Sequence, residues 1–465
     1  MSLATPPYTR DVTRPDAAPA VSVTPPIDRL PRALGLTSSI ALVVGITIGS
    51  GIFRSPAAIA GRVHNATVML ALWVVGGLVS LCGALSFAEL AAALPETGGY
   101  YVYLREGWGR AVAFLFGWAQ LVLIRASALG GLAIAFSDYA LGAIGIDPAA
   151  HVLASRGLAA AALVGAAAVN IVGLDLGAAV VSISAGAKFL ALAVLVVSAL
   201  VAGSVVNALH VSAGAPVGMG NMGLALVSIL WAYDGFADVS YAAGEVKDPQ
   251  KTLPRAIILG TCAIIVIYVL ANLAYLSVSS VEQVARSPLI AADTMSAVFG
   301  PRSAALVSLL VAVSAFGALN GLMLASPRLF FAMARDGMFF RPIARIHERF
   351  LTPYVAILLA ALLGVALVFS RSFEALTSTF VIAIWPFYAL AVAGVYRLRR
   401  LRPDLPRPYR TTGYPVVPGV FVAATIWFLL NALLTEPVST GITFALILAG
   451  LPIYFALFAR GRLSR

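Results

Sequence analysis

Charged side chains are scarce in this sequence, and their scarcity excludes most classes of protein. Asp, Glu, Lys and Arg together make up 11% of the 465 residues, whereas soluble globular proteins contain about 25%. Hydrophobic residues make up 60% of the chain. A chain with so few charges cannot cover a soluble surface, so the composition predicts an all-α protein that crosses a membrane many times.

Cysteine and histidine are also rare. Cys82 and Cys262 lie in separate apolar segments and indicate no disulfide framework. The histidines show no spacing typical of a metal site; they are His64, His151, His210 and His347. No Walker-type motif for nucleotide hydrolysis occurs, nor does a cluster of nucleophile, base and orienting residue. We therefore expect no metal, no cofactor and no enzyme activity.

Apolar segments fill most of the chain, each long enough to cross a bilayer, for which roughly 20 residues suffice. Twelve are present, at residues 38–60, 67–93, 108–142, 154–173, 177–203, 222–244, 254–278, 301–334, 353–370, 374–396, 415–434 and 438–459. We interpret residues 33–459 as a single twelve-helix domain. Residues 1–32 lack the apolar core of a signal peptide, and we expect a disordered tail there.

The basic residues predict the orientation, because cytoplasmic loops carry an excess of Lys and Arg. If the N-terminus is cytoplasmic, the basic residues left on the outer side are Arg62, Arg156, Arg286, Arg302 and Arg371. We therefore expect a multi-pass protein of the cell (inner) membrane, with residues 1–32 and 460–465 in the cytoplasm. The net charge of +11 then reflects topology rather than nucleic-acid binding.

The stretch from Gly45 to Pro56 interrupts the first apolar segment. It reads Gly-Ile-Thr-Ile-Gly-Ser-Gly-Ile-Phe-Arg-Ser-Pro, and its Gly and Ser residues are poor helix formers, so we expect a broken helix at Gly49 to Gly51. In many transporters a broken helix holds the substrate, with N–H groups receiving an anion and C=O groups a cation. The zwitterionic end of a free amino acid fits both. Alternatively, Gly45 and Gly49 form a GxxxG pair for helix packing.

A second interruption, Tyr233-Asp-Gly235, lies in the sixth apolar segment. Paired interruptions in corresponding segments point to a binding site near the middle of the membrane.

Four motifs together resemble the amino acid–polyamine–organocation (APC) superfamily, nearest to its L-type amino acid transporter and related bacterial permease branches. They are Gly-Ser-Gly-Ile-Phe53, Ala-Glu-Leu90, Pro-x-x-Gly-Gly-Tyr-x-x-Tyr103 and Gly-Glu-Val-Lys-Asp-Pro249, and the similarity continues to about Arg349. The resemblance implies two inverted five-helix repeats, helices 1–5 (about 37–203) and helices 6–10 (about 222–396). Two extra helices (about 415–459) follow, and helices 1 and 6 are broken.

The breaks and the resemblance together yield ten candidate substrate-binding residues. They are Thr47, Ile48, Gly49, Ser50, Gly51, Ser127, Ala128, Trp231, Ala232 and Asp234. By the resemblance, Trp231 lies over the substrate and gates it from outside, and Asp234 presents its backbone carbonyl. Ser127 and Ala128 are small, which suggests either tight helix packing or room for a substrate side chain.

Two basic residues, Lys188 and Arg125, are expected at membrane depth, where a charge needs a partner. A buried lysine can release and regain a proton, so Lys188 is a candidate proton carrier. The superfamily places a lysine here where sodium-coupled relatives bind sodium, linking the first and eighth helices. The alternative is a structural cation of fixed charge. For Arg125 the alternatives are a substrate carboxylate, a structural partner or a cavity edge.

The implied function is secondary active transport of free L-amino acids across the membrane by alternating access. Small and apolar candidate residues favour neutral substrates, while Asp234 leaves cationic amino acids and polyamines open. Proton symport and one-for-one exchange (antiport) are both compatible with the motifs. An amino acid sensor that does not transport is the alternative class.

The expected partners are the amino acid substrate, membrane lipid and, in the coupled alternative, protons, with the chain a monomer or homodimer. Some L-type relatives in animals join a heavy chain through a cysteine between the third and fourth helices. The corresponding loop, about residues 142–153, contains no cysteine, so we expect no disulfide-linked subunit.

Overall fold

The computed structural model describes residues 32–96, 98–172, 174–204, 216–350 and 352–459. Within these ranges the chain is helical, and its extended pairing is one bridge between Leu34 and Val246. The predicted tails, residues 1–32 and 460–465, lie outside the described residues except for residue 32.

The first half of the chain forms nine helices that the structure describes. They are α1 (Leu36–Thr47), α2 (Gly51–Val63), α3 (Ala66–Ala93), α4 (Tyr100–Trp108), α5 (Arg110–Ala119), the π-helix η1 (Gln120–Ile124), α6 (Arg125–Ala143), α7 (Val152–Val172) and α8 (Leu174–Ala202).

The second half continues from residue 219 in the same helical manner. Its elements are α10 (Met219–Ala232), the 3-10 helix η2 (Asp238–Glu245), α11 (Pro249–Val278), α12 (Val281–Arg286), α13 (Ile290–Phe299), α14 (Pro301–Arg335), the 3-10 helix η3 (Arg341–Ala344), α15 (Tyr354–Ser370), α16 (Phe373–Leu401), α17 (Val416–Thr435), α18 (Pro437–Leu448) and α19 (Gly450–Leu457).

Eight helical stretches of the described chain are long and apolar enough to cross a membrane, and α1 with α2 makes a ninth if the bent pair is one span. Three shorter apolar helices, Lys188–Ala202, α10 and α15, lie where the fifth, sixth and ninth spans were predicted. The all-helical membrane fold is therefore confirmed, and the total of twelve spans stays a prediction.

Helix contacts follow the pattern expected from two structural repeats. The second, third and fourth predicted spans contact the seventh, eighth and ninth, as α3 with α11, α6 with α14, and α7 with α15. Two further sets of contacts also match: α1 with α11 corresponds to α3 with α10, and α8 with α14 to α6 with α16. The inverted relation between the repeats stays a prediction.

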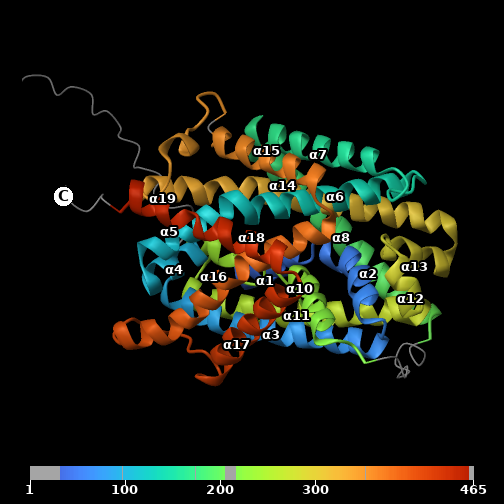
Figure 1. Cartoon of the computed structure of the whole chain (residues 1–465), viewed down its shortest axis with the longest axis horizontal. Helices are drawn as coiled ribbons and strands as arrows, with labels where there is room; N and C mark the ends of the chain where they lie inside the picture. Colours follow the sequence, from blue (N-terminus) through green and yellow to red (C-terminus); the bar gives the residue numbers. More distant parts are fainter. Residues whose placement is uncertain (1–31, 97, 173, 205–215, 351, 460–465) are drawn as a thin grey trace, which may run out of the picture.

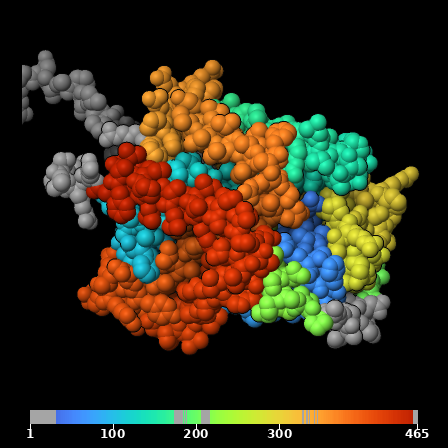
Figure 2. Space-filling view, viewed as in Figure 1, coloured from blue at the N-terminus to red at the C-terminus, as the bar shows by residue number. Residues whose placement is uncertain are grey.

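Figure 1 shows α6, α7, α14 and α15 running alongside one another, with α1 and α10 in the middle of the molecule. Helices α12 and α13 lie at one end of the bundle, and α4 and α19 at the other. In the space-filling view, the orange and red C-terminal helices cover much of the face turned toward the reader (Figure 2). Blue and light green atoms of the N-terminal and middle helices stay visible beside them (Figure 2).

The sequence did not predict several local features. Tyr100–Trp108 forms a separate helix because the chain turns at Gly109, whose φ is +90°. Between the seventh and eighth predicted spans the chain forms α12 and α13. A capping box begins α12, in which the Ser280 hydroxyl accepts from Gln283 N–H and the Gln283 side chain accepts from Ser280 N–H.

Loops predicted to share a side of the membrane do meet at one end of the bundle. Arg105 pairs with Asp336 at 3.4 Å, and Arg402 pairs with Glu106 at 2.6 Å. These contacts join the second, eighth and tenth predicted spans at their ends. Which of the two sides faces the cytoplasm stays a prediction.

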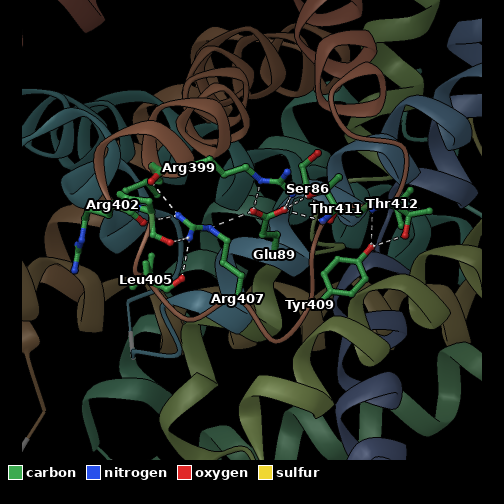
Figure 3. A network of polar contacts seen from close by, with 12 residues as sticks. Ser86, Glu89, Arg399, Arg402, Leu405, Arg407, Tyr409, Thr411 and Thr412 are labelled. Atoms are coloured by element: carbon green, nitrogen blue, oxygen red, sulfur yellow. Dashed lines mark hydrogen bonds and ion pairs between the residues drawn. The ribbon is translucent and has the colours of Figure 1, made fainter.

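Glu89, from the Ala-Glu-Leu motif, is the centre of a buried polar network at that same end (Figure 3). Arg399 donates from Nε and Nη2 to the two carboxylate oxygens, at 2.8 and 2.6 Å. Thr411 donates its N–H and its hydroxyl to Oε2, both at 2.7 Å. The Arg407 Nε lies 3.6 Å from Oε1, and its guanidinium also caps α16 by donating to Leu398 O at 2.9 Å. One carboxylate thus fixes the loop after α16 onto α3.

We predict that Glu89→Gln destabilises the protein by about 3 kcal/mol, because removing one partner of a buried pair leaves an uncompensated charge. The measurement is thermal unfolding of the purified variant in detergent. Glu96→Gln is the matched control, since the Glu96 side chain is 60% exposed and lies 3.4 Å from Arg105, where an ion pair contributes little. Equal melting temperatures for the two variants would contradict the prediction.

Candidate functional site

The first break lies where the glycine-rich stretch predicts it, one residue earlier than Gly49–Gly51. Helix α1 ends at Thr47 and α2 begins at Gly51, with a bend of 42° between them. Ile48 has φ −73° and ψ 88°, and Gly49 N–H donates to Thr47 O at 2.8 Å. This is an inverse γ-turn, so the N–H of Gly49 already has an acceptor. By helix geometry, the first N–H groups of α2 have none inside their own helix.

The second break follows α10, as predicted. The helix ends at Ala232, and the chain turns at Gly235, where φ is +99°, before the 3-10 helix η2. A residue with a side chain is strained at such a φ, which accounts for glycine in Asp-Gly.

The two breaks lie directly against each other. A Cβ atom added to Gly51 would lie 2.5 Å from Ala232 Cα, and one added to Gly235 would lie 3.5 Å from Thr47 Cα. By contrast, Cβ atoms added to Gly45 and Gly49 would have no neighbour within 4 Å among the described residues. The close approach of helices seen in the described chain therefore occurs at Gly51, and the packing of Gly45 and Gly49 as a pair stays a prediction.

Side chains from two other helices bind the carbonyl groups freed at the breaks. Lys188 Nζ, on α8, donates to Gly45 O and, at 3.0 Å, to Ile48 O. The Tyr268 hydroxyl, on α11, lies 2.9 Å from Thr47 O and 3.0 Å from Ala232 O. A hydroxyl has one hydrogen, so Tyr268 donates to the end of one broken helix or the other. A cation at the C-terminal end of α1 also complements the helix dipole.

Pro56 creates another carbonyl that needs a donor. Proline has no N–H, so Ile52 O lacks its usual partner within α2. The Tyr275 hydroxyl, on α11, donates to Ile52 O at 3.2 Å, and the Tyr139 hydroxyl, on α6, donates to Phe53 O at 2.6 Å. The second half of the broken helix is thus held by α6 and α11.

An ion pair fixes α2 at the end of the bundle that carries α12 and α13. Arg54 Nη2 lies 3.0 Å from Asp138 Oδ2 on α6, and both side chains are largely buried. Arg54 also donates to Pro288 O at 2.8 Å, and Ser155 on α7 donates to Asp138 at 2.6 Å. The guanidinium lies 5.4 Å from the centre of the Phe373 ring on α16. Movement of α2 away from these helices would have to separate buried charges.

Trp231, the predicted gate, is wedged between α6 and α16. Its ring meets Phe380 edge-on, with centroids 4.9 Å apart. A Cβ atom on Gly131 would lie 3.8 Å from the indole and 3.5 Å from Thr377. Ser127 and Ala128 lie one turn before Gly131 on α6, on the same face, and the structure thus brings the predicted α6 residues toward Trp231.

Several predicted site residues carry buried polar atoms that have no hydrogen-bond partner among the described residues. They are Thr47 Oγ1, Ser50 Oγ, Ser127 Oγ and Trp231 Nε1. Such atoms are costly to leave unpaired, and each lies on an element that borders the breaks. They are suited to bind a polar ligand.

Arg125 lies near the acidic residues of the second break. The carboxylates of Asp234 and Asp238 are within electrostatic range of its guanidinium, but no ion pair within 4.0 Å joins it to either in the described chain. The Tyr388 hydroxyl on α16 donates to Asp234 Oδ1 at 2.8 Å. The Asp234 carboxylate is thus engaged by Tyr388, and the three alternatives for Arg125 stay predictions.

Sequence reasoning missed Tyr268, Tyr275, Arg54 with Asp138, and the π-helix before Arg125. π-Helical turns occur often at functional sites, and this one puts Gln120 in the interior, where both its amide atoms are buried without a partner in the described chain. Tyrosine hydroxyls inside apolar segments were the available signal. No group of His, Cys, Asp or Glu that could hold a metal occurs in the described part of the chain.

Comparison with known proteins identifies the family. Residues 34–458 match the family described as amino acid permease. The b(0,+)-type amino acid transporter 1 of Mus musculus is 32% identical over 92% of this chain and 88% of its own length. The serine/threonine exchanger SteT of Bacillus subtilis is 30% identical over 93% and 98%, and the human cystine/glutamate transporter is 30% identical over 92% and 85%.

We predict that Gly51→Ala lowers both stability and ligand binding, whereas Gly49→Ala lowers only the affinity for the ligand. At Gly51 the added methyl group would collide with the backbone of Ala232, so we expect a lower melting temperature together with loss of ligand binding. At Gly49 the methyl group has open space, so we expect an unchanged melting temperature and at least a tenfold weaker uptake affinity, because the methyl group enters the space beside the break. Thermal unfolding and the concentration dependence of uptake measure both. Wild-type affinity in Gly49→Ala would show that ligand does not approach this backbone.

Proposed function

Because the chain belongs to the amino acid permease family, we propose that it is a membrane transporter that exchanges neutral L-amino acids by alternating access and is not an enzyme. The observation that carries this proposal is the contact between the two helix breaks, at Gly51 with Ala232 and Gly235 with Thr47. It gathers N–H groups, carbonyl groups and unpaired buried hydroxyls at one interior point. These groups suit the ammonium and carboxylate that every amino acid carries.

The hydrogen bonding of the Asp234 carboxylate favours neutral substrates. Its carboxylate accepts a hydrogen bond from Tyr388 at 2.8 Å, so one of its oxygens is already engaged and it is less available to pair with a cationic side chain. The neighbours of Trp231 given by these contacts in the described chain are Gly131, Thr377 and Phe380, and none of the three side chains is charged. A cationic amino acid or polyamine would leave its charge without a partner there.

Exchange is favoured over proton symport by the contacts of Lys188. The ammonium donates to two carbonyls at the end of α1, and these bonds hold the break in its conformation. A neutral amine would weaken both bonds. We therefore assign Lys188 the role of a structural cation that replaces a bound ion.

Alternating access follows if α1 and α2 move in turn. Helix α1 is attached at its start, where Ala33 and Leu34 N–H donate to Glu245 O at 2.9 and 3.0 Å. Helix α2 is attached by Arg54 to Asp138. The break between them permits one attachment to open while the other persists. On this proposal the chain acts without a disulfide-linked subunit, with its basic side in the cytoplasm.

The experiment that tests transport is uptake of labelled amino acid, from a panel of the twenty, by proteoliposomes of the purified chain. We expect uptake of neutral amino acids only when the vesicles are preloaded with amino acid, and no response to acid outside. Uptake by empty vesicles that rises with the proton gradient would establish symport instead. Binding without uptake in either case would identify a sensor.

We further predict that Lys188→Met abolishes exchange and lowers the melting temperature, because two carbonyls at membrane depth lose their donor. Lys251→Met is the matched control, since Lys251 is exposed in the first turn of α11, and it should behave as wild type. Wild-type exchange by a stable Lys188→Met protein would show that the ammonium is not needed to hold the break.

A further inference from the structure

A cleft of about 320 Å³ opens between α5 and α19 on the outside of the bundle. Its residues are distant in the sequence from both helix breaks. It is lined by Trp108, Arg110, Ala111, Tyr454, Phe455, Phe458 and Ala459. Helix α19 lies beside α5 at the end of the molecule that carries α4 (Figure 1). No residue of this lining belongs to the candidate site.

The shape of the cleft follows from how the two helices pack. At the far end of α5, Gly450 lets α19 come close to Trp118, since a Cβ atom there would lie 2.6 Å from the indole. Trp118 also donates to Leu446 O at 2.9 Å. Toward Arg110 the large rings of Tyr454 and Phe458 pack on Phe114, with centroids 5.4 and 5.0 Å away. The two helices therefore pack closely at Gly450 and Trp118 and are held further apart by aromatic rings near Arg110.

The open end of the cleft is positively charged. Arg110 is exposed and forms no ion pair with any residue that the structure describes. It begins α5, where the helix dipole adds partial positive charge. Arg397, also exposed, places its guanidinium 5.2 Å from the centre of the Trp108 ring. The lining contains no acidic residue, so this end of the cleft selects an anion.

The combination of an apolar wall and a cationic rim matches one kind of occupant. We propose that the cleft binds an anionic phospholipid, with its phosphate at Arg110 and an acyl chain against Phe455 and Phe458. Tryptophan and tyrosine are typical of the level of lipid headgroups, and the cleft lies where the apolar helices α5 and α19 reach the arginine-rich end. Phe455 is 60% exposed, which leaves its ring available to a lipid chain.

The inference does not rest on the proposed transport function, because binding is measured without transport. The probe is fluorescently labelled phosphatidylglycerol, titrated against the full-length protein in a neutral detergent, with labelled phosphatidylcholine alongside. We expect the wild type to prefer phosphatidylglycerol. Arg110→Gln should weaken phosphatidylglycerol binding about fivefold, the contribution of one basic residue near a lipid surface, and leave phosphatidylcholine unchanged. Phe455→Ala should weaken both.

Arg400→Gln is the matched control, because Arg400 is exposed near the end of α16 and does not line the cleft. It should bind phosphatidylglycerol as the wild type does. Equal losses in Arg110→Gln and Arg400→Gln would show general surface attraction and overturn the proposal. So would equal affinity of the wild type for the two lipids, or no binding at all, as expected if the chain's own C-terminal residues filled the cleft. Competition by glycerophosphoglycerol as strong as by the intact lipid would show that the acyl chain is not bound there.

Discussion

A helix that breaks inside a membrane must find hydrogen-bond partners for its freed backbone, and this requirement governs the centre of the molecule. Water cannot supply the partners, so side chains of neighbouring helices must. Lys188 on α8 binds two carbonyls of the first break, and Tyr268 on α11 reaches the last carbonyl of both broken helices. The conformation of both breaks therefore depends on where α8 and α11 place these donors.

Two charged residues inside the bundle follow the same rule, since each is matched by a segment distant in sequence. Arg54 binds Asp138, and Glu89 receives donors from α16 and the loop after it. These pairs contribute less to stability than their number suggests, because desolvation offsets much of the attraction. Their effect is to fix which helix ends lie together. Contacts between apolar surfaces cannot do this alone, because lipid is equally apolar and gives no hydrophobic preference for one helix partner.

The two ends of the first broken helix have different attachments. Backbone hydrogen bonds tie the chain before α1 to the end of η2, while an arginine and a carboxylate tie α2 to α6. The two halves are separate helices that meet at a bend of 42°. A transporter needs separate attachments of this kind if its site is to open to one side at a time. They do not involve the side chain of a substrate, so relatives with different named substrates could share them.

The sequence by itself determined the class and the location of the candidate site. Low charge and long apolar segments require a membrane helix bundle, and Gly-Ser-Gly and Asp-Gly are poor helix formers wherever they occur, so both breaks were found to within a residue. Hydrophobicity and helix propensity depend on residues that are neighbours in the chain, so they can be read from the sequence alone. The partners of the breaks were not predictable, because nothing near Tyr268, Tyr275 or Asp138 in the chain shows which carbonyl or guanidinium each will meet. Only the tertiary structure decided that Gly51 makes the close contact with Ala232 and which two carbonyls at the end of α1 Lys188 binds. Each of these depends on the relative placement of helices that lie scores of residues apart.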